Sequence, residues 1–228
     1  MLPHSRHMTH AEPKLAVLVD FDGTITTEDI GDLVIETFAR EDWRPVSNAF
    51  ERGEISLREL WAAEMSYLRA TDTGAMLEYV REVAKVRPGF HDFVDFCNDN
   101  AVPLEVASSG ITFYINAVLD KAGVTGLPVA APTLAFDSEG RGLVTFENGL
   151  RDCGITAMCK CERVWQQRRL GRTVLFVGDG SSDYCAALQA DHVVARRRLA
   201  DYCTRENVPF TPFEHFDEVR AVVEDLVR

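Results

Sequence analysis

The stretch LAVLVDFDGTITTEDI, residues 15–30, joins an apolar run to two closely spaced carboxylates. Residues 15–19 are all apolar, a pattern typical of a strand that is buried on both faces of a parallel sheet. Asp20 and Asp22 follow directly. Because a buried carboxylate without partners is costly, these two residues need capping contacts, a bound metal or a chemical role.

The overall composition narrows the classes of partner. The chain has 228 residues and a formal net charge of −12, and its length fits one large domain or a core with a smaller insert. The acidic surface argues against broad nucleic-acid or anionic-membrane binding, but it leaves room for a locally basic pocket that binds a small anion. No apolar run approaches the roughly 20 residues of a membrane helix. We therefore expect a small-molecule ligand, no nucleic acid and no membrane contact.

The N-terminus and the cysteines indicate a cellular location. Residues 1–14 lack the apolar segment of a secretory signal and are interpreted as a disordered leader. Six cysteines in a chain of this length do not suggest a disulfide framework, so we expect a cytoplasmic protein with reduced thiols. A metal or redox role of Cys153, Cys159 and Cys161 is left open, although structural zinc sites usually have other spacings. The oligomeric state is also open, with a homodimer as one alternative.

Strand and helix patterns alternate along most of the chain. Strands are predicted at 15–19, 103–107, 173–177 and 192–195, with helices at 110–123, 182–190 and 216–227. This alternation predicts an α/β fold with a doubly wound, Rossmann-like parallel sheet. Residues 133–150 predict a β-hairpin, because two alternating runs flank a turn that carries two glycines.

Residues 28–85 interrupt the alternation with helical periodicity. They predict a small helical bundle inserted just after the first strand, with linkers near 26–29 and 85–88. The expected organisation is therefore an α/β core made of residues 15–27 and 86–228, and a helical insert made of residues 28–85.

Reactive side chains follow three of the predicted strands at their carboxyl ends, where ligands bind in open parallel sheets. Lys160 lies in sequence between the second and third groups. The three groups are Asp20 and Asp22; Ser108, Ser109 and Gly110; and Asp179 and Asp183.

This combination of side chains suits phosphoryl transfer. Carboxylate oxygens and a backbone carbonyl are ligands that Mg²⁺ prefers. Asp20 could attack phosphorus and form an aspartyl-phosphate, while Asp22 could protonate the leaving oxygen and later activate water. Mg²⁺ and Lys160 would supply positive charge, and Ser108 with nearby backbone N–H groups, at Ser109 and Gly110, would hold the phosphate oxygens.

The segment Asp20-Phe21-Asp22-Gly23-Thr24 resembles the first motif of the haloacid dehalogenase (HAD) superfamily of phosphatases, and Ser108, Lys160 and Gly178-Asp179…Asp183 match the next three motifs in order. The resemblance implies that Asp20 is the nucleophile and a metal ligand, and that Asp22 is the acid/base and a metal ligand through its backbone carbonyl. It implies that Ser108 binds phosphate, that Lys160 orients the nucleophile and the phosphate, that Asp179 binds Mg²⁺ and that Asp183 supports the metal shell. The helical insert resembles the C1 cap of this superfamily.

Within the superfamily the chain is similar to the phosphoserine-phosphatase-like branch. It resembles most the methionine-salvage phosphatases, which act on 2-hydroxy-3-keto-5-methylthiopentenyl-1-phosphate, in its first motif, Asp29, the hairpin and the pair Cys159-Lys160. It departs from phosphoserine phosphatases at Asp29, where they have a glutamate, and at Glu64, where they have an arginine. Ser109 also replaces a usual glycine of the second motif, a change expected to reshape the phosphate loop.

Several functions remain open at this point. The alternatives are a phosphoserine phosphatase, a phosphocholine or phosphoethanolamine phosphatase, a phosphotransferase with an alcohol acceptor, and a binder of phosphate ligands without activity. The polar candidates for substrate specificity in the insert are Glu28, Asp29 and Arg52.

Overall fold

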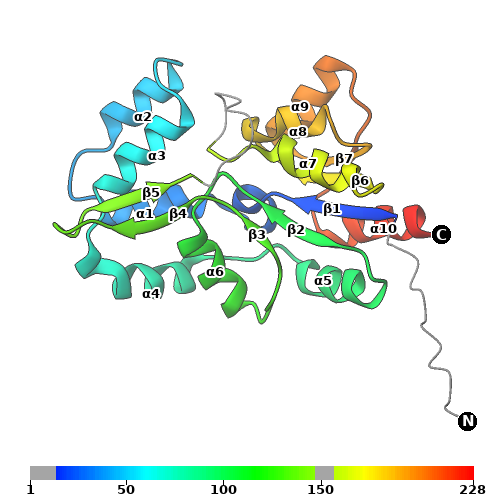
Figure 1. Cartoon of the computed structure of the whole chain (residues 1–228), viewed down its shortest axis with the longest axis horizontal. Helices are drawn as coiled ribbons and strands as arrows, with labels where there is room; N and C mark the ends of the chain where they lie inside the picture. Colours follow the sequence, from blue (N-terminus) through cyan, green and yellow to red (C-terminus); the bar gives the residue numbers. More distant parts are fainter. Residues whose placement is uncertain (1–13, 147–156) are drawn as a thin grey trace, which may run out of the picture.

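A computed structural model describes residues 14–146 and 157–228 of the chain. Its centre is a six-stranded parallel sheet with the strand order β3-β2-β1-β6-β7-β8 (Figure 1). The predicted α/β class is confirmed. The strands are β1 (Leu15–Val19), β2 (Leu104–Ala107), β3 (Val129–Ala130), β6 (Thr173–Gly178), β7 (His192–Ala195) and β8 (Thr211–Pro212). The two edge strands β3 and β8 were not predicted, because two residues are too few to produce a sequence pattern.

Strand β1 is central, and side chains alternate across its two faces. Leu15, Val17 and Val19 pack in the larger hydrophobic cluster with helices α5 (Phe90–Asp99), α6 (Thr112–Lys121) and α10 (Phe216–Val227). Leu18 packs in a second cluster with α7 (Lys160–Arg169), α8 (Tyr184–Ala187) and α9 (Arg197–Glu206). Figure 1 shows α5 and α6 on one side of β1 and α7, α8 and α9 on the other. The continuous apolar run of β1 is explained by this burial on both faces.

The segment that follows β1 forms four α-helices: α1 (Ile30–Phe38), α2 (Arg44–Glu51), α3 (Leu57–Ser66) and α4 (Thr73–Val83), with a short 3₁₀ turn at Ala70–Asp72. The two linker segments through which the chain enters and leaves these helices lie side by side. Thr26 and Val86 form an antiparallel bridge, and the Thr27 amide donates to the Lys85 carbonyl at 3.0 Å. Helix α4 also packs against α6 (Figure 1). The division into a core and a cap stays a prediction.

The predicted hairpin is present in the described residues as β4 (Thr133–Phe136) and β5 (Gly142–Thr145). Its Asp137 side chain accepts hydrogen bonds from the amides of Glu139 and Arg141, which closes the turn. Strand β5 packs against α3, so the hairpin extends the helical insert. The end of the predicted hairpin, 147–150, and the predicted leader, except its last residue, lie outside the described residues.

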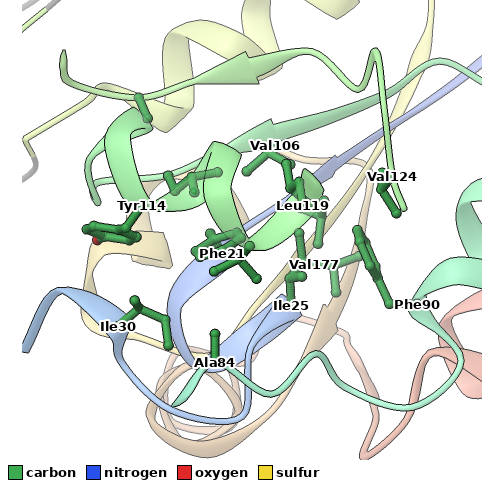
Figure 2. Close-up of a cluster of buried hydrophobic side chains, with 14 of the residues drawn as sticks. Phe21, Ile25, Ile30, Ala84, Phe90, Val106, Tyr114, Leu119, Val124 and Val177 are labelled. Carbon is green, nitrogen blue, oxygen red and sulfur yellow. The ribbon is translucent and has the colours of Figure 1, made fainter. Parts of the chain in front are cut away.

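The hydrophobic cluster connects the sheet to the insert. Figure 2 shows Phe21 and Ile25 among residues from several helices, with Ile30 of α1 and Tyr114 of α6 at the border. The loop that carries Asp20 and Asp22 is therefore anchored on both sides by buried apolar contacts. Within residues 14–146 and 157–228, no helix is both long and apolar enough to cross a membrane.

Candidate active site

A cleft of about 380 Å³ opens at the carboxyl edge of the sheet. Three neighbouring strands, β2, β1 and β6, end there, so their following residues come together although they are far apart in sequence. The cleft is lined by Asp20, Asp22, Gly23, Asp29, Phe50, Leu57, Trp61, Ser108, Ser109, Gly110, Asp179, Gly180, Ser181, Ser182, Arg197 and Arg198. Most of the predicted site residues thus lie in one place.

Lys160 is the first residue of α7, and its side chain is only 1% exposed. Its ammonium lies 2.6 Å from Asp20 Oδ1 and 2.5 Å from Asp183 Oδ1, and it donates to Ser182 Oγ at 3.1 Å. Burial lowers the pKa of Lys160, but the Asp183 and Asp20 carboxylates outweigh it and the net shift is upward. Lys160 is not among the described residues that line the cleft. Its charge therefore acts on the site through its contact with Asp20.

The oxygens of Asp20, Asp179 and Asp183 lie within 4.8 Å of one another. Burial and the Asp183 carboxylate raise the pKa of Asp20 to about 8, against the opposing effect of Lys160. Burial and Asp183 also raise the pKa of Asp179, which accepts a hydrogen bond from Thr24 Oγ1 at 3.1 Å. Mutually repelling hard oxygen donors of this kind fit a divalent cation such as Mg²⁺.

Asp183 is already occupied by protein donors. Its Oδ2 accepts from the amides of Asp179 at 3.0 Å and Gly180 at 2.9 Å, while Oδ1 contacts Lys160. Asp20 and Asp179 therefore have more free oxygen lone pairs for a cation, and Asp183 holds the loop that carries Asp179. This geometry fits the supporting role expected for Asp183.

The Asp22 carboxyl is fixed at both oxygens. Oδ1 accepts from the Ile30 amide at 2.9 Å, and Oδ2 accepts from the Tyr114 hydroxyl at 2.8 Å. Burial and the nearby Asp29 carboxylate raise the pKa of Asp22 well above its usual value. This upward shift favours the protonated form, which is the form that protonates a leaving group. Tyr114 was not identified from the sequence.

The loop between Asp20 and Thr26 is held by a buried arginine from the predicted second linker. Arg87 donates to the carbonyls of Gly23 and Thr24, each at 2.7 Å, and of Thr26 at 3.2 Å. Gly23 has φ +76°, and a β-carbon there would overlap the Asp179 carboxylate, so only glycine fits. Sequence reasoning missed Arg87, because its partners precede it by more than 60 residues.

The phosphate loop predicted at residues 108–110 has its own internal bond, from the Gly110 amide to Ser108 Oγ at 2.9 Å. Ser109 does not have a positive φ, so the usual glycine of this position is not required by the backbone here. Its hydroxyl is buried and has no hydrogen-bond partner within the described chain, and Ser109 lines the cleft. Buried hydroxyls are normally bonded, so this one is available to a ligand oxygen.

The insert contributes Asp29, Phe50, Leu57 and Trp61 to the cleft. Asp29 caps α1 by accepting from the Asp32 amide at 3.0 Å. Solvent reaches Asp29, but the protein around it in the cleft excludes part of its water. This partial burial, followed by the charge of Asp32, raises the pKa of Asp29 to about 7.

Two of the predicted specificity residues do not line the cleft. Arg52 turns to Glu54 on the surface, with Nε 2.7 Å from Oε1. Glu28 contributes its backbone carbonyl to Thr26 Oγ1 at 2.6 Å. Sequence proximity to a motif did not fix the direction of these side chains.

The cations among the described lining residues are Arg197 and Arg198, at the start of α9, which were not predicted. Arg197 has φ +47° and lies 3.7 Å from Asp179 Oδ2. These two arginines make one end of an otherwise acidic cleft favourable for an anion.

The expectation of reduced thiols is wrong for one pair. Cys161 and Cys185, 24 residues apart, form a disulfide between α7 and the start of α8. Sequence spacing does not reveal it, because only the packing of α7 on α8 brings the two residues together. Cys159 is buried, and Cys153 lies outside the described residues.

Comparison with known proteins agrees with this geometry. The profile of the family described as haloacid dehalogenase-like hydrolase matches residues 17–188, and the chain belongs to this family. The 2-hydroxy-3-keto-5-methylthiopentenyl-1-phosphate phosphatase of Brevibacillus brevis (strain 47 / JCM 6285 / NBRC 100599) is 27% identical over 218 residues, which cover 93% of this chain and 96% of that protein. The protein of the same name from Lysinibacillus sphaericus (strain C3-41) is 28% identical over 220 residues, which cover 94% and 96%.

Solved structures support the fold. The phosphoserine phosphatase of T. onnurineus superposes with a TM-score of 0.66 at 17% identity, covering 97% of this chain and 98% of that chain. A phospho-aspartyl intermediate analogue of a phosphoserine phosphatase superposes with a TM-score of 0.65 at 16% identity, covering 92% and 98%. The family, the relatives and the cleft together make this chain a HAD-family phosphatase, a phosphoric monoester hydrolase.

Proposed function

We propose that this phosphatase is Mg²⁺-dependent, works through an aspartyl-phosphate on Asp20, and has the methionine-salvage enol phosphate as its substrate. The observation that carries the mechanism is the placement of Asp20 between the buried Lys160 ammonium and the Asp179 carboxylate, with Asp22 at the same strand end. A nucleophile and a separate acid that line one cleft, with a buried cation bonded to the nucleophile, serve a reaction rather than simple binding.

In the proposed mechanism, a carboxylate oxygen of Asp20 attacks phosphorus, and the bond from phosphorus to the leaving oxygen breaks. Asp22 gives its proton to that oxygen, so the alcohol or enol leaves neutral. Asp22 then removes a proton from water, whose oxygen attacks phosphorus as the bond from phosphorus to the Asp20 oxygen breaks. Inorganic phosphate leaves, and both carboxyls return to their starting state.

Mg²⁺ would be held by Asp20, by Asp179 and by the backbone carbonyl of Asp22. When bound, it supplies positive charge that offsets the negative charge of the phosphate and of the clustered carboxylates. Lys160 orients Asp20, and Asp183 holds Lys160 and the Asp179 loop in place. Ser108 and the unpaired hydroxyl of Ser109 accommodate phosphate oxygens, with Gly110 keeping the loop close to Asp22.

The choice of substrate rests on the insert side of the cleft. Phe50, Leu57 and Trp61 form an apolar wall that suits an uncharged thioether tail. Phosphoserine suits this wall less, because the described lining residues of the insert offer its carboxylate no cation, and Glu64 is a buried acid. The relatives named as methionine-salvage phosphatases support the same choice.

One observation favours a second candidate. Asp29 lines the same cleft as the aromatic side chains of Phe50 and Trp61, and acidic and aromatic groups together bind ammonium groups well. Phosphocholine or phosphoethanolamine is therefore the alternative substrate.

A cytoplasmic location also stays a prediction, as does the oligomeric state, which light scattering would test.

The test is phosphate release from a panel of monoesters, with Mg²⁺ and with EDTA. The panel holds the methionine-salvage enol phosphate, phosphocholine, phosphoethanolamine and phosphoserine. We expect Mg²⁺-dependent release that is fastest from the enol phosphate and absent in Asp20→Asn. A higher kcat/KM for phosphocholine would overturn the substrate, wild-type rates in Asp20→Asn would overturn the mechanism, and turnover that needs an added alcohol would indicate a phosphotransferase.

A further inference from the structure

The hydroxyl of Tyr114 lies where the Asp22 loop, the phosphate loop and helix α1 meet. Tyr114 is 2% exposed, and its Oη donates to Asp22 Oδ2 at 2.8 Å. A β-carbon added to Gly31 of α1 would lie 3.0 Å from this Oη, and one added to Gly110 would overlap it. In Figure 2, Tyr114 lies beside Phe21 with its oxygen at the end directed away from the hydrophobic cluster.

The Asp22 carboxyl is held from two directions by these neighbours. Its second donor is the backbone amide of Ile30, 2.9 Å from Oδ1, at the start of α1. Rotation of the carboxyl about its χ2 torsion would break both bonds. Since proton transfer requires a carboxyl oxygen within hydrogen-bond reach of the leaving oxygen, this orientation matters for the chemical step.

We propose that Tyr114 is a positioning residue that holds the Asp22 carboxyl for protonation of the leaving group. The proposal rests on the acid/base role proposed for Asp22. Tyr114 itself is not among the described residues that line the cleft, so it acts through Asp22 and not on the substrate. Its ring packs 6.2 Å from that of Phe21, which fixes the tyrosine independently of the hydroxyl.

This role makes a specific kinetic demand. An ester with a good leaving group needs little help from an acid, whereas a basic leaving oxygen needs the proton. Loss of the Tyr114 hydroxyl must therefore slow poor leaving groups more than good ones. Phenyl phosphate and p-nitrophenyl phosphate form a suitable pair, because they have similar shapes and differ in the basicity of the oxygen that leaves.

The experiment compares kcat/KM for these two esters in wild type, Tyr114→Phe and Tyr79→Phe. The last variant is the matched control, since Tyr79 of α4 packs edge-on against Phe38 of α1 and is not among the described residues that line the cleft. We expect Tyr114→Phe to lower kcat/KM for phenyl phosphate about tenfold and to leave the value for p-nitrophenyl phosphate within about twofold. The control should leave both values unchanged.

The ratio of the two values is independent of how much of a preparation is folded, because inactive protein cancels from it. An unchanged ratio in Tyr114→Phe, whether both rates fall or neither does, would overturn the positioning role. Asp22→Asn separates this outcome from failure of the mechanism. If that variant also leaves the ratio unchanged, Asp22 is not the acid and the proposed function fails with it; if it changes the ratio, only the role of Tyr114 is lost.

Discussion

Glu64 offers the sharpest test of the electrostatics of the insert. It lies on α3 and is 5% exposed. Burial, followed by the charges of Asp32 and Asp29, raises its pKa from the usual 4.5 to about 8. A carboxyl with a raised pKa binds its proton more tightly in the native state than in the unfolded state. The contribution of Glu64 to the free energy of unfolding must therefore fall as pH rises between 4.5 and 8, and level off above this range.

The size of this effect follows from the same values. Each unit of difference between the native and the unfolded pKa corresponds to about 1.4 kcal/mol. Ionisation of Glu64 can therefore lower the free energy of unfolding by at most about 5 kcal/mol. Solvent and counter-ions reaching the cleft reduce this amount, and we expect about 2 kcal/mol. Glu64→Gln removes the ionisable group while keeping its shape. As the pH rises from 5 to 8, the free energy of unfolding of this variant should therefore increase by about 2 kcal/mol relative to that of wild type.

Urea unfolding, followed by tryptophan fluorescence, would measure this gain. Wild type, Glu64→Gln and the exposed control Glu78→Gln are compared at pH 5 and pH 8, so that titration of other groups cancels in the difference. Any fixed cost of the amide cancels as well. The quantity compared is the free energy of unfolding of each variant minus that of wild type. If this difference changes between pH 5 and pH 8 no more for Glu64→Gln than for Glu78→Gln, the reasoning on Glu64 is refuted.

Three further changes probe the site. Asp22→Asn should lower kcat about 10²–10⁴-fold while Mg²⁺ affinity, measured by calorimetry, stays near wild type, since only its backbone carbonyl is expected to touch the metal; an equal loss of affinity would contradict that role. Arg87→Met should destabilise the fold by about 3 kcal/mol in thermal or urea unfolding, because it strips the carbonyls of Gly23 and Thr24 of a buried charged donor; an unchanged stability would argue against this clamp. Ser109→Gly should weaken competitive inhibition by inorganic phosphate about fivefold, and an unchanged inhibition constant would remove its hydroxyl from phosphate binding.

The parts of the site that could be predicted are those encoded locally. An apolar run followed at once by Asp20, Ser108 or Asp179 marks both a buried strand and a polar group at its carboxyl end. Parallel pairing of neighbouring strands then brings these ends together without further information. Lys160 was placed by its motif, and the structure brings it to Asp20 across 140 residues of sequence.

The parts that were missed depend on lateral packing. Tyr114 meets Asp22 across 92 residues, and Arg87 meets Thr24 across 63, and no periodicity in either segment indicates these contacts. Arg52 is not among the described residues that line the cleft for a related reason. A polar side chain on the insert can turn to the cleft or to a local partner, and Glu54 two residues away provided the nearer charge.

The balance of charge at Asp20 links the fold to the proposed metal. Asp20, Asp179 and Asp183 lie close together, and Lys160 is the buried cation among them. Burial, followed by the charge of Asp183, raises the pKa of Asp20 to about 8 against the opposing effect of Lys160, and this shift favours the protonated form. A protonated carboxyl is a poor nucleophile, and an incoming phosphate raises the pKa further by adding negative charge. A divalent cation on the free oxygens of Asp20 and Asp179 would reverse both effects, because it would favour the anionic form of the nucleophile and attract the phosphate.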